Sequence, residues 1–172
     1  FLTKPPENER LYQEGQKQLQ LGQFAFALKT LNEAVAVKPD DPRALLALAR
    51  AYVGVDQVDK AWECIVKAQQ LGAGVVAEPQ LASDLAKYYR QHGQYQRAVE
   101  LLRPLAQNNV NGKKAELCDL DAAWGDQMLH EGDLKQALRC WEEVKELHDG
   151  SRAGEADTRL ATIYQKLGED MA

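Results

Sequence analysis

The sequence predicts an all-α fold in which antiparallel helix pairs are stacked one after another. Three observations support this prediction. Apolar and small residues recur three and four positions apart, which places them on one face of a helix. The pattern repeats after 34 residues, since Gly15 aligns with Ala49 and Ala27 with Ala61. Turn-forming residues separate the periodic segments. One such pair cannot bury its own apolar faces, so a stack of several pairs is predicted.

The best-defined pair is predicted within residues 43–68, with a break between Gly54 and Asp56. Ala49 and Ala61 are small enough to let two helix backbones approach closely, and larger residues fill the space around that contact. Four residues define the packing face of each helix: Leu45, Leu48, Ala49 and Tyr52 in the first, and Val58, Ala61, Ile65 and Ala68 in the second.

The same pattern divides the whole chain. Pro5-Pro6 delays the first helix, Asp41 is a candidate N-cap, and Pro42 suits the first turn that follows it. Pro104 falls inside a predicted second helix and should kink it or end it early. The fourth pair is expected to begin early, near Lys114, with a long first helix. The predicted segments are a lead at 1–7, repeats at 8–41, 42–78 (with a linker), 79–117 (with a loop) and 118–153, and a trailing helix, a half repeat or cap, at 154–172.

Composition excludes several classes of protein. The 172 residues carry a net charge of −5, whereas nucleic-acid binding needs a dense basic surface, so nucleic acid is not expected as a partner. No apolar run is long enough to cross a membrane, and there is no signal peptide. We expect a cytoplasmic protein, or a cytoplasm-facing piece of a longer chain, because the sequence begins with Phe1 rather than Met.

Neither catalysis nor a cofactor is predicted. The three cysteines are far apart and form no CxxC pair, and the three histidines lack metal-ligand spacing with them. We therefore expect buried free thiols and no metal or cofactor. Neither phosphate-binding glycine motif occurs, and no nucleophile–base grouping is visible. The expected class is not an enzyme.

The pattern of these helix pairs resembles that of the tetratricopeptide repeat family. Four turn residues (Gly22, Asp56, Gly93 and Gly132) and four second-helix alanines (Ala27, Ala61, Ala98 and Ala137) carry the resemblance. Asp121 departs from it, because a large apolar residue is usual at that position. The resemblance implies a right-handed superhelical array of four repeats plus a trailing helix, whose concave groove is lined by the first helix of each pair. It implies a scaffold or assembly factor that binds a protein or peptide and performs no chemistry.

Polar residues on the first helices, off the packing face, are the candidate site. The centre of the groove is predicted to be basic and its far end acidic, which suits a partner segment that mixes acidic and apolar residues. The alternative is a solvated face with no ligand. Chaperone-binding members of the family use a clamp of Lys, Asn and Arg residues. None of these residues stands at the matching positions of this chain, which are occupied by Tyr12, Gln16, Ala47, Gln80 and Asp84. The candidate groove residues are Tyr12, Gln16, Arg43, Leu46, Arg50, Val53, Ser83, Lys87, Arg90 and Asp126.

Two alternatives from other classes stay open. The unpaired trailing helix would make the chain a self-associating scaffold and hence a homo-oligomer, since its apolar residues cannot all face inward if nothing follows. The chain would otherwise be a regulatory segment of a larger multidomain protein. The residues assigned to self-association are Leu160, Ile163, Tyr164 and Leu167.

Overall fold

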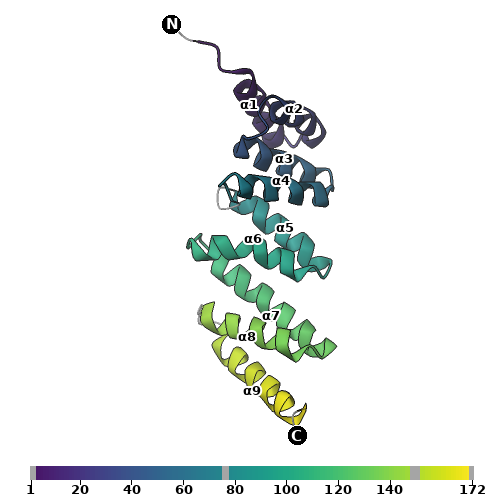
Figure 1. Cartoon of the computed structure of the whole chain (residues 1–172), viewed down its shortest axis with the longest axis vertical. Helices are drawn as coiled ribbons and strands as arrows, with labels where there is room; N and C mark the ends of the chain where they lie inside the picture. Colours follow the sequence, from purple (N-terminus) through teal and green to yellow (C-terminus); the bar gives the residue numbers. More distant parts are fainter. Residues whose placement is uncertain (1–2, 75–77, 148–151, 171–172) are drawn as a thin grey trace. The chain divides into compact units, whose positions relative to one another are not determined.

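The computed structural model describes residues 3–74, 78–147 and 152–170. Every regular element in those ranges is a helix, so the predicted all-α class is confirmed (Figure 1). No helix in them is long and apolar enough to span a membrane. The helices are α1 (Glu7–Gln20), α2 (Phe24–Val37), α3 (Pro42–Gly54), α4 (Val58–Gln70), α5 (Pro79–Gln91), α6 (Tyr95–Gln107), α7 (Lys113–Glu131), α8 (Leu134–Leu147) and α9 (Ala153–Asp170).

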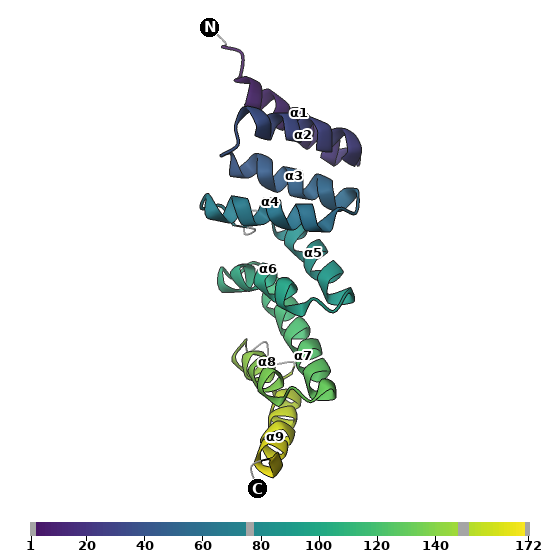
Figure 2. The ribbon, with the colours of Figure 1, turned by 45° about the vertical axis from the view of Figure 1, so that its right-hand side comes forward.

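The chain forms two compact units, Phe1–Leu81 and Ala82–Ala172, with the border in the first turn of α5. In the first unit α1 packs on α2, α2 on α3 and α3 on α4, which gives successive antiparallel layers (Figure 2). Small residues make these contacts close. A Cβ atom on Gly15 of α1 would lie 2.5 Å from the side chain of Leu31 on α2, so only glycine fits there.

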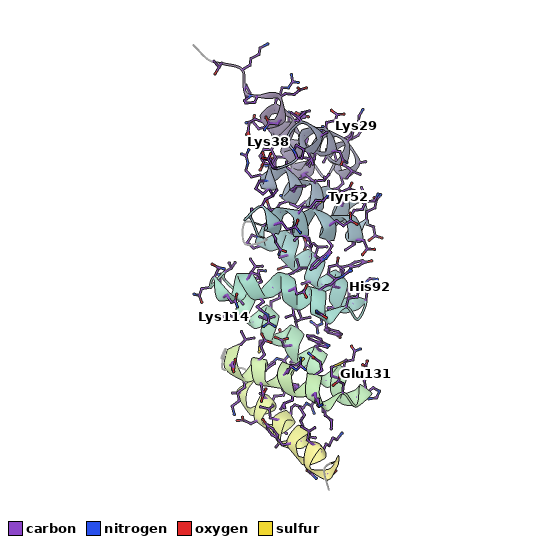
Figure 3. The ribbon with its side chains drawn as sticks, in the orientation of Figure 1. Lys29, Lys38, Tyr52, His92, Lys114 and Glu131 are labelled. Atoms are coloured by element: carbon purple, nitrogen blue, oxygen red, sulfur yellow. The ribbon has the colours of Figure 1, made fainter. Side chains whose placement is uncertain are left out.

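The second unit repeats this arrangement with α6 on α7, α7 on α8 and α8 on α9. Gly125 of α7 takes the place of Gly15, since a Cβ atom there would lie 2.6 Å from Nε1 of the fully buried Trp141. In Figure 3, His92 at the end of α5 and Glu131 at the end of α7 lie on one side of this unit, and Lys114 at the start of α7 lies on the other. The C-terminal ends of these two first helices therefore lie on the same side, as a repeat requires.

Local chemistry explains the helix ends. The carboxylate of Asp41 accepts a hydrogen bond of 3.0 Å from the backbone N–H of Arg43, and Pro42 occupies the first turn of α3, as predicted. The long α7 begins at Lys113, close to its predicted start.

Pro104 does not end α6 early, because that helix continues to Gln107. A proline there removes only one N–H donor, and six buried residues of the same helix hold it in place: Ala98, Val99, Leu101, Leu102, Leu105 and Ala106.

The trailing helix α9 packs its apolar face onto α8. Ile163 is fully buried and Leu160 nearly so, in a cluster that includes Trp141 and Val144 of α8 and is flanked by the half-buried Leu167. Tyr164 faces outward, with 54% of its surface exposed, and its hydroxyl lies 3.2 Å from Glu142. Leu160 and Ile163, two of the four residues assigned to self-association, are thus buried within the unit. They pack against α8, whereas the sequence pattern predicted that they would pack against another chain.

Candidate protein-binding surface

In the first unit, the candidate groove residues are connected to one another. The Arg43 guanidinium on α3 pairs with Glu9 of α1 at 2.9 Å and with Asp41 at 3.0 Å. It also lies 4.9 Å from the ring centroid of Tyr12, whose hydroxyl accepts a hydrogen bond of 2.9 Å from Gln16. The hydrogen bonds that Arg43 donates to Asp41 and Glu9 raise its pKa. The residues are therefore held in fixed positions, and the Arg43 charge is already compensated.

The remaining candidates of the first unit are less available than predicted. Arg50 forms an ion pair of 3.6 Å with Glu78. Leu46 is buried, with 3% of its surface exposed, so it belongs to the core and not to an open groove. Val53 is half-buried. Helical spacing predicted that Leu46 lies off the packing face and in the groove, but it could not show that the side chain would be buried.

The α5 helix of the second unit contributes to a polar cluster and carries two exposed cations. On α5, Ser83 donates to Glu116 of α7 at 3.0 Å, and Lys113 contacts both of these residues. Lys87 and Arg90 are exposed on α5, and neither side chain has an ion pair among the residues described. They are the uncompensated charges of the predicted basic centre.

The acidic end predicted for the groove is neutralised by two arginines, Arg152 just before α9 and Arg159 on α9. Asp126 of α7 pairs with Arg159 at 2.9 Å, and Asp119 pairs with Arg152 at 2.8 Å. Sequence reasoning missed these arginines. The available signal was their distance from the aspartates, 33 residues in each case, which is nearly the repeat length and matches the 34 residues between Glu9 and Arg43.

In the described part of the chain, no group of three His, Cys, Asp or Glu side chains could hold a metal ion. Cys64, Cys118 and Cys140 are buried, and none of them forms a disulfide. Burial raises the pKa of the Cys64 thiol to about 11 and that of Cys140 to about 12. Thiols with such pKa values are poor nucleophiles at neutral pH.

Comparisons with known proteins agree with this picture. Residues 18–70 match the tetratricopeptide repeat family model. The solved structure of YrrB, described as a tetratricopeptide protein with an unusual peptide-binding site, is 18% identical, covers 92% of this chain and 76% of its own, and has a TM-score of 0.55. A crystal structure of MamA is 20% identical, covers 94% and 84%, and has a TM-score of 0.55. A search of curated proteins found no match. The predicted resemblance is confirmed: the family's repeat lies in residues 18–70, and the chain has the fold of these structures.

Proposed function

Since residues 18–70 carry a tetratricopeptide repeat and the chain has the tetratricopeptide fold, we propose that it is a protein–protein interaction module. The partner is a protein or peptide segment that lies along the first helices. The scaffold or assembly role predicted from the sequence belongs to this proposal, and the module itself supplies no catalytic group. YrrB, which has the same fold, is described as having a peptide-binding site, and this supports the proposal by analogy of fold alone.

The observation that carries the proposal is the difference between compensated and uncompensated charges. Arg43, Arg50 and Asp126 have partners within this chain, whereas Lys87 and Arg90 on α5 are exposed without an ion pair among the residues described. The two lie three residues apart on one helix, so they are neighbours on its surface. A partner that brings carboxylates to α5 would gain attraction without breaking an internal pair.

Apolar contacts must supplement this attraction. An exposed ion pair contributes only about 0.2–1 kcal/mol, so two of them cannot give a specific complex. Tyr88 is half-buried and follows Lys87 directly, and its ring stacks on that of His92 with centroids 4.1 Å apart. We place the apolar anchor of the partner beside this pair of rings, which agrees with the predicted acidic and apolar segment.

The test is charge reversal on α5. The full chain is used to capture partners from its source organism, and their affinity is then measured for the double variant Lys87→Glu with Arg90→Glu. Binding should weaken at least tenfold, which is about 1.4 kcal/mol, and binding of the parent chain should weaken with added salt.

The matched control reverses two exposed lysines elsewhere in the same unit, Lys135→Glu with Lys166→Glu, which changes the net charge equally. It should bind within about twofold of the parent chain, well below a tenfold change. Equal losses in the two double variants would show a general charge effect, and unchanged binding in the α5 variant would show that this surface is only solvated.

A further inference from the structure

The second unit buries a carboxyl group that has no partner. Asp121, in the interior of α7, has 1% of its surface exposed. Neither of its carboxyl oxygens has a hydrogen-bond partner in the described part of the chain. A polar group in such a position destabilises the fold unless it is neutral or finds a partner. The residue therefore needs an explanation beyond packing.

The charged groups that face Asp121 come from the two second helices packed on α7. Arg103 of α6 and Glu143 of α8 both act on it electrostatically, and they form an ion pair of 2.8 Å with each other. Cys140 of α8 is a further titratable neighbour, as the effect of Asp121 on its thiol shows. Arg152, which precedes α9, and Arg159 of α9 are engaged elsewhere on α7, by Asp119 and Asp126.

The Arg103–Glu143 pair stands between two surface hollows. The larger hollow, of about 450 Å³, is lined by residues of α6 and α8 and by Trp124 of α7. The smaller, of about 340 Å³, extends towards Lys114 and Leu147. Both are lined by Arg103 and Glu143, so this ion pair is their common border.

The environment of Asp121 sets its proton affinity in the physiological range. Burial has the largest effect and Glu143 adds to it, so that together, against the opposing effect of Arg103, they raise the pKa of Asp121 to about 7. At pH 6 the carboxyl is therefore about nine-tenths protonated, and at pH 8 about nine-tenths ionised. A neutral carboxyl leaves the Arg103–Glu143 pair undisturbed.

We propose that Asp121 is a proton-controlled switch for the Arg103–Glu143 ion pair. When Asp121 releases its proton to solvent, its carboxylate competes with Glu143 for the single Arg103 guanidinium and repels Glu143. Arg103 turns inward to Asp121, Glu143 moves to solvent, and the two hollows become continuous. One proton taken up reverses the change.

The experiment follows three groups in the full chain by NMR between pH 5.5 and 8.5: the carboxyl carbons of Asp121 and Glu143, and the side-chain Nε–H of Arg103. The Asp121 and Arg103 signals should shift together, with one midpoint near pH 7. The Nε–H of Arg159, which pairs with Asp126, is the internal control and should not shift over this range.

Two variants make the result decisive. Asp121→Asn mimics the protonated carboxyl and should abolish the Arg103 shift. Glu143→Gln removes the competing carboxylate, so the midpoint of Asp121 should fall by about one pH unit or more. An Asp121 that titrates below pH 5 would overturn the proposal. So would an Arg103 signal that stays flat while Asp121 titrates, or one that still shifts in Asp121→Asn.

Discussion

The two units each bury one carboxyl group among the described residues, and they do so in opposite ways. Asp41 in the first unit is 4% exposed and Asp121 in the second is 1% exposed. Burial raises the pKa of Asp41, but the hydrogen bonds and charge of Arg43 outweigh this effect and lower it overall. For Asp121, burial and Glu143 prevail over Arg103 and raise the pKa to about 7.

Position in the helix accounts for the difference. Asp41 precedes the first turn of α3, where backbone N–H groups have no intrahelical acceptor and are free to donate to it. Asp121 lies in the interior of α7, where the N–H groups of the helix are already bonded to its own carbonyls. The buried carboxylate of Asp41 thus stabilises its unit and that of Asp121 destabilises its own, because only the first position offers hydrogen-bond donors.

The largest effect expected from this comparison is that the free energy of unfolding of the second unit depends on pH. Between 3.8 and about 7 the folded chain holds the Asp121 proton that the unfolded chain has released, so stability declines as pH rises through this window. The loss approaches about 4 kcal/mol, since each pKa unit corresponds to about 1.4 kcal/mol. Asp121→Asn should remove this decline, measured as the free energy of urea unfolding at several pH values. Parallel pH profiles of the parent chain and the variant would contradict the prediction.

Gly125→Ala should destabilise the second unit by about 1–3 kcal/mol, because the new Cβ would displace the fully buried indole of Trp141. In the first unit, a Cβ on Gly54 would lie even closer to a side chain, 2.2 Å from the ring of Phe24. That ring is 36% exposed and can move towards solvent. Gly54→Ala should therefore stay within about 1 kcal/mol of the parent chain in urea unfolding. A larger loss for Gly54→Ala than for Gly125→Ala would reverse this ranking.

Asp41→Ala should cost about 1 kcal/mol in the first unit, since α3 loses its N-cap hydrogen bond. The pKa of Asp41 is lowered, so the stabilisation is present above its ordinary value of 3.8 and is lost as pH falls below it. The difference between the parent chain and the variant should therefore be constant from pH 5 to 8 and shrink in acid. A difference that instead grew in acid would contradict the assignment of the cap.

The smallest effect is expected for the exposed pair between α7 and α9. Arg159→Gln should cost about 0.2–1 kcal/mol, because both side chains of the Arg159–Asp126 pair are more than 40% exposed. The cost should shrink further in concentrated salt. A loss of several kcal/mol that salt does not change would mean that this arginine acts through packing over Trp141, 5.8 Å away.

Much of the fold could be predicted from the sequence because it depends on local signals. The N-cap of α3 and the early start of α7 are set by residues within a few positions of each feature, and the glycines at close contacts recur at equivalent places in the repeat. The course of α6 through Pro104 could not be predicted in this way, since burial along the whole helix outweighs the loss of one donor.

The candidate surface was harder to predict because its charges are settled by residues a full repeat away. Arg43 and Asp126 lie off the packing face, as expected, but their partners Glu9 and Arg159 come from neighbouring first helices. The sequence marked Asp121 as unusual without showing that it would be buried unpartnered. Asp121 is left without a partner because Arg103 forms its ion pair with Glu143. Such a pairing between separate helices cannot be read from the spacing of residues along the sequence.

The buried cysteines give each unit a built-in reporter of its local opening. Cys64 lies in the first unit, and Cys118 and Cys140 lie in the second. A thiol reagent reaches such side chains only when the surrounding helices open, so the labelling rate at each cysteine reports the local opening equilibrium of its unit. Mass spectrometry of the native chain during labelling would therefore read the two opening equilibria separately in one sample, with no introduced probe.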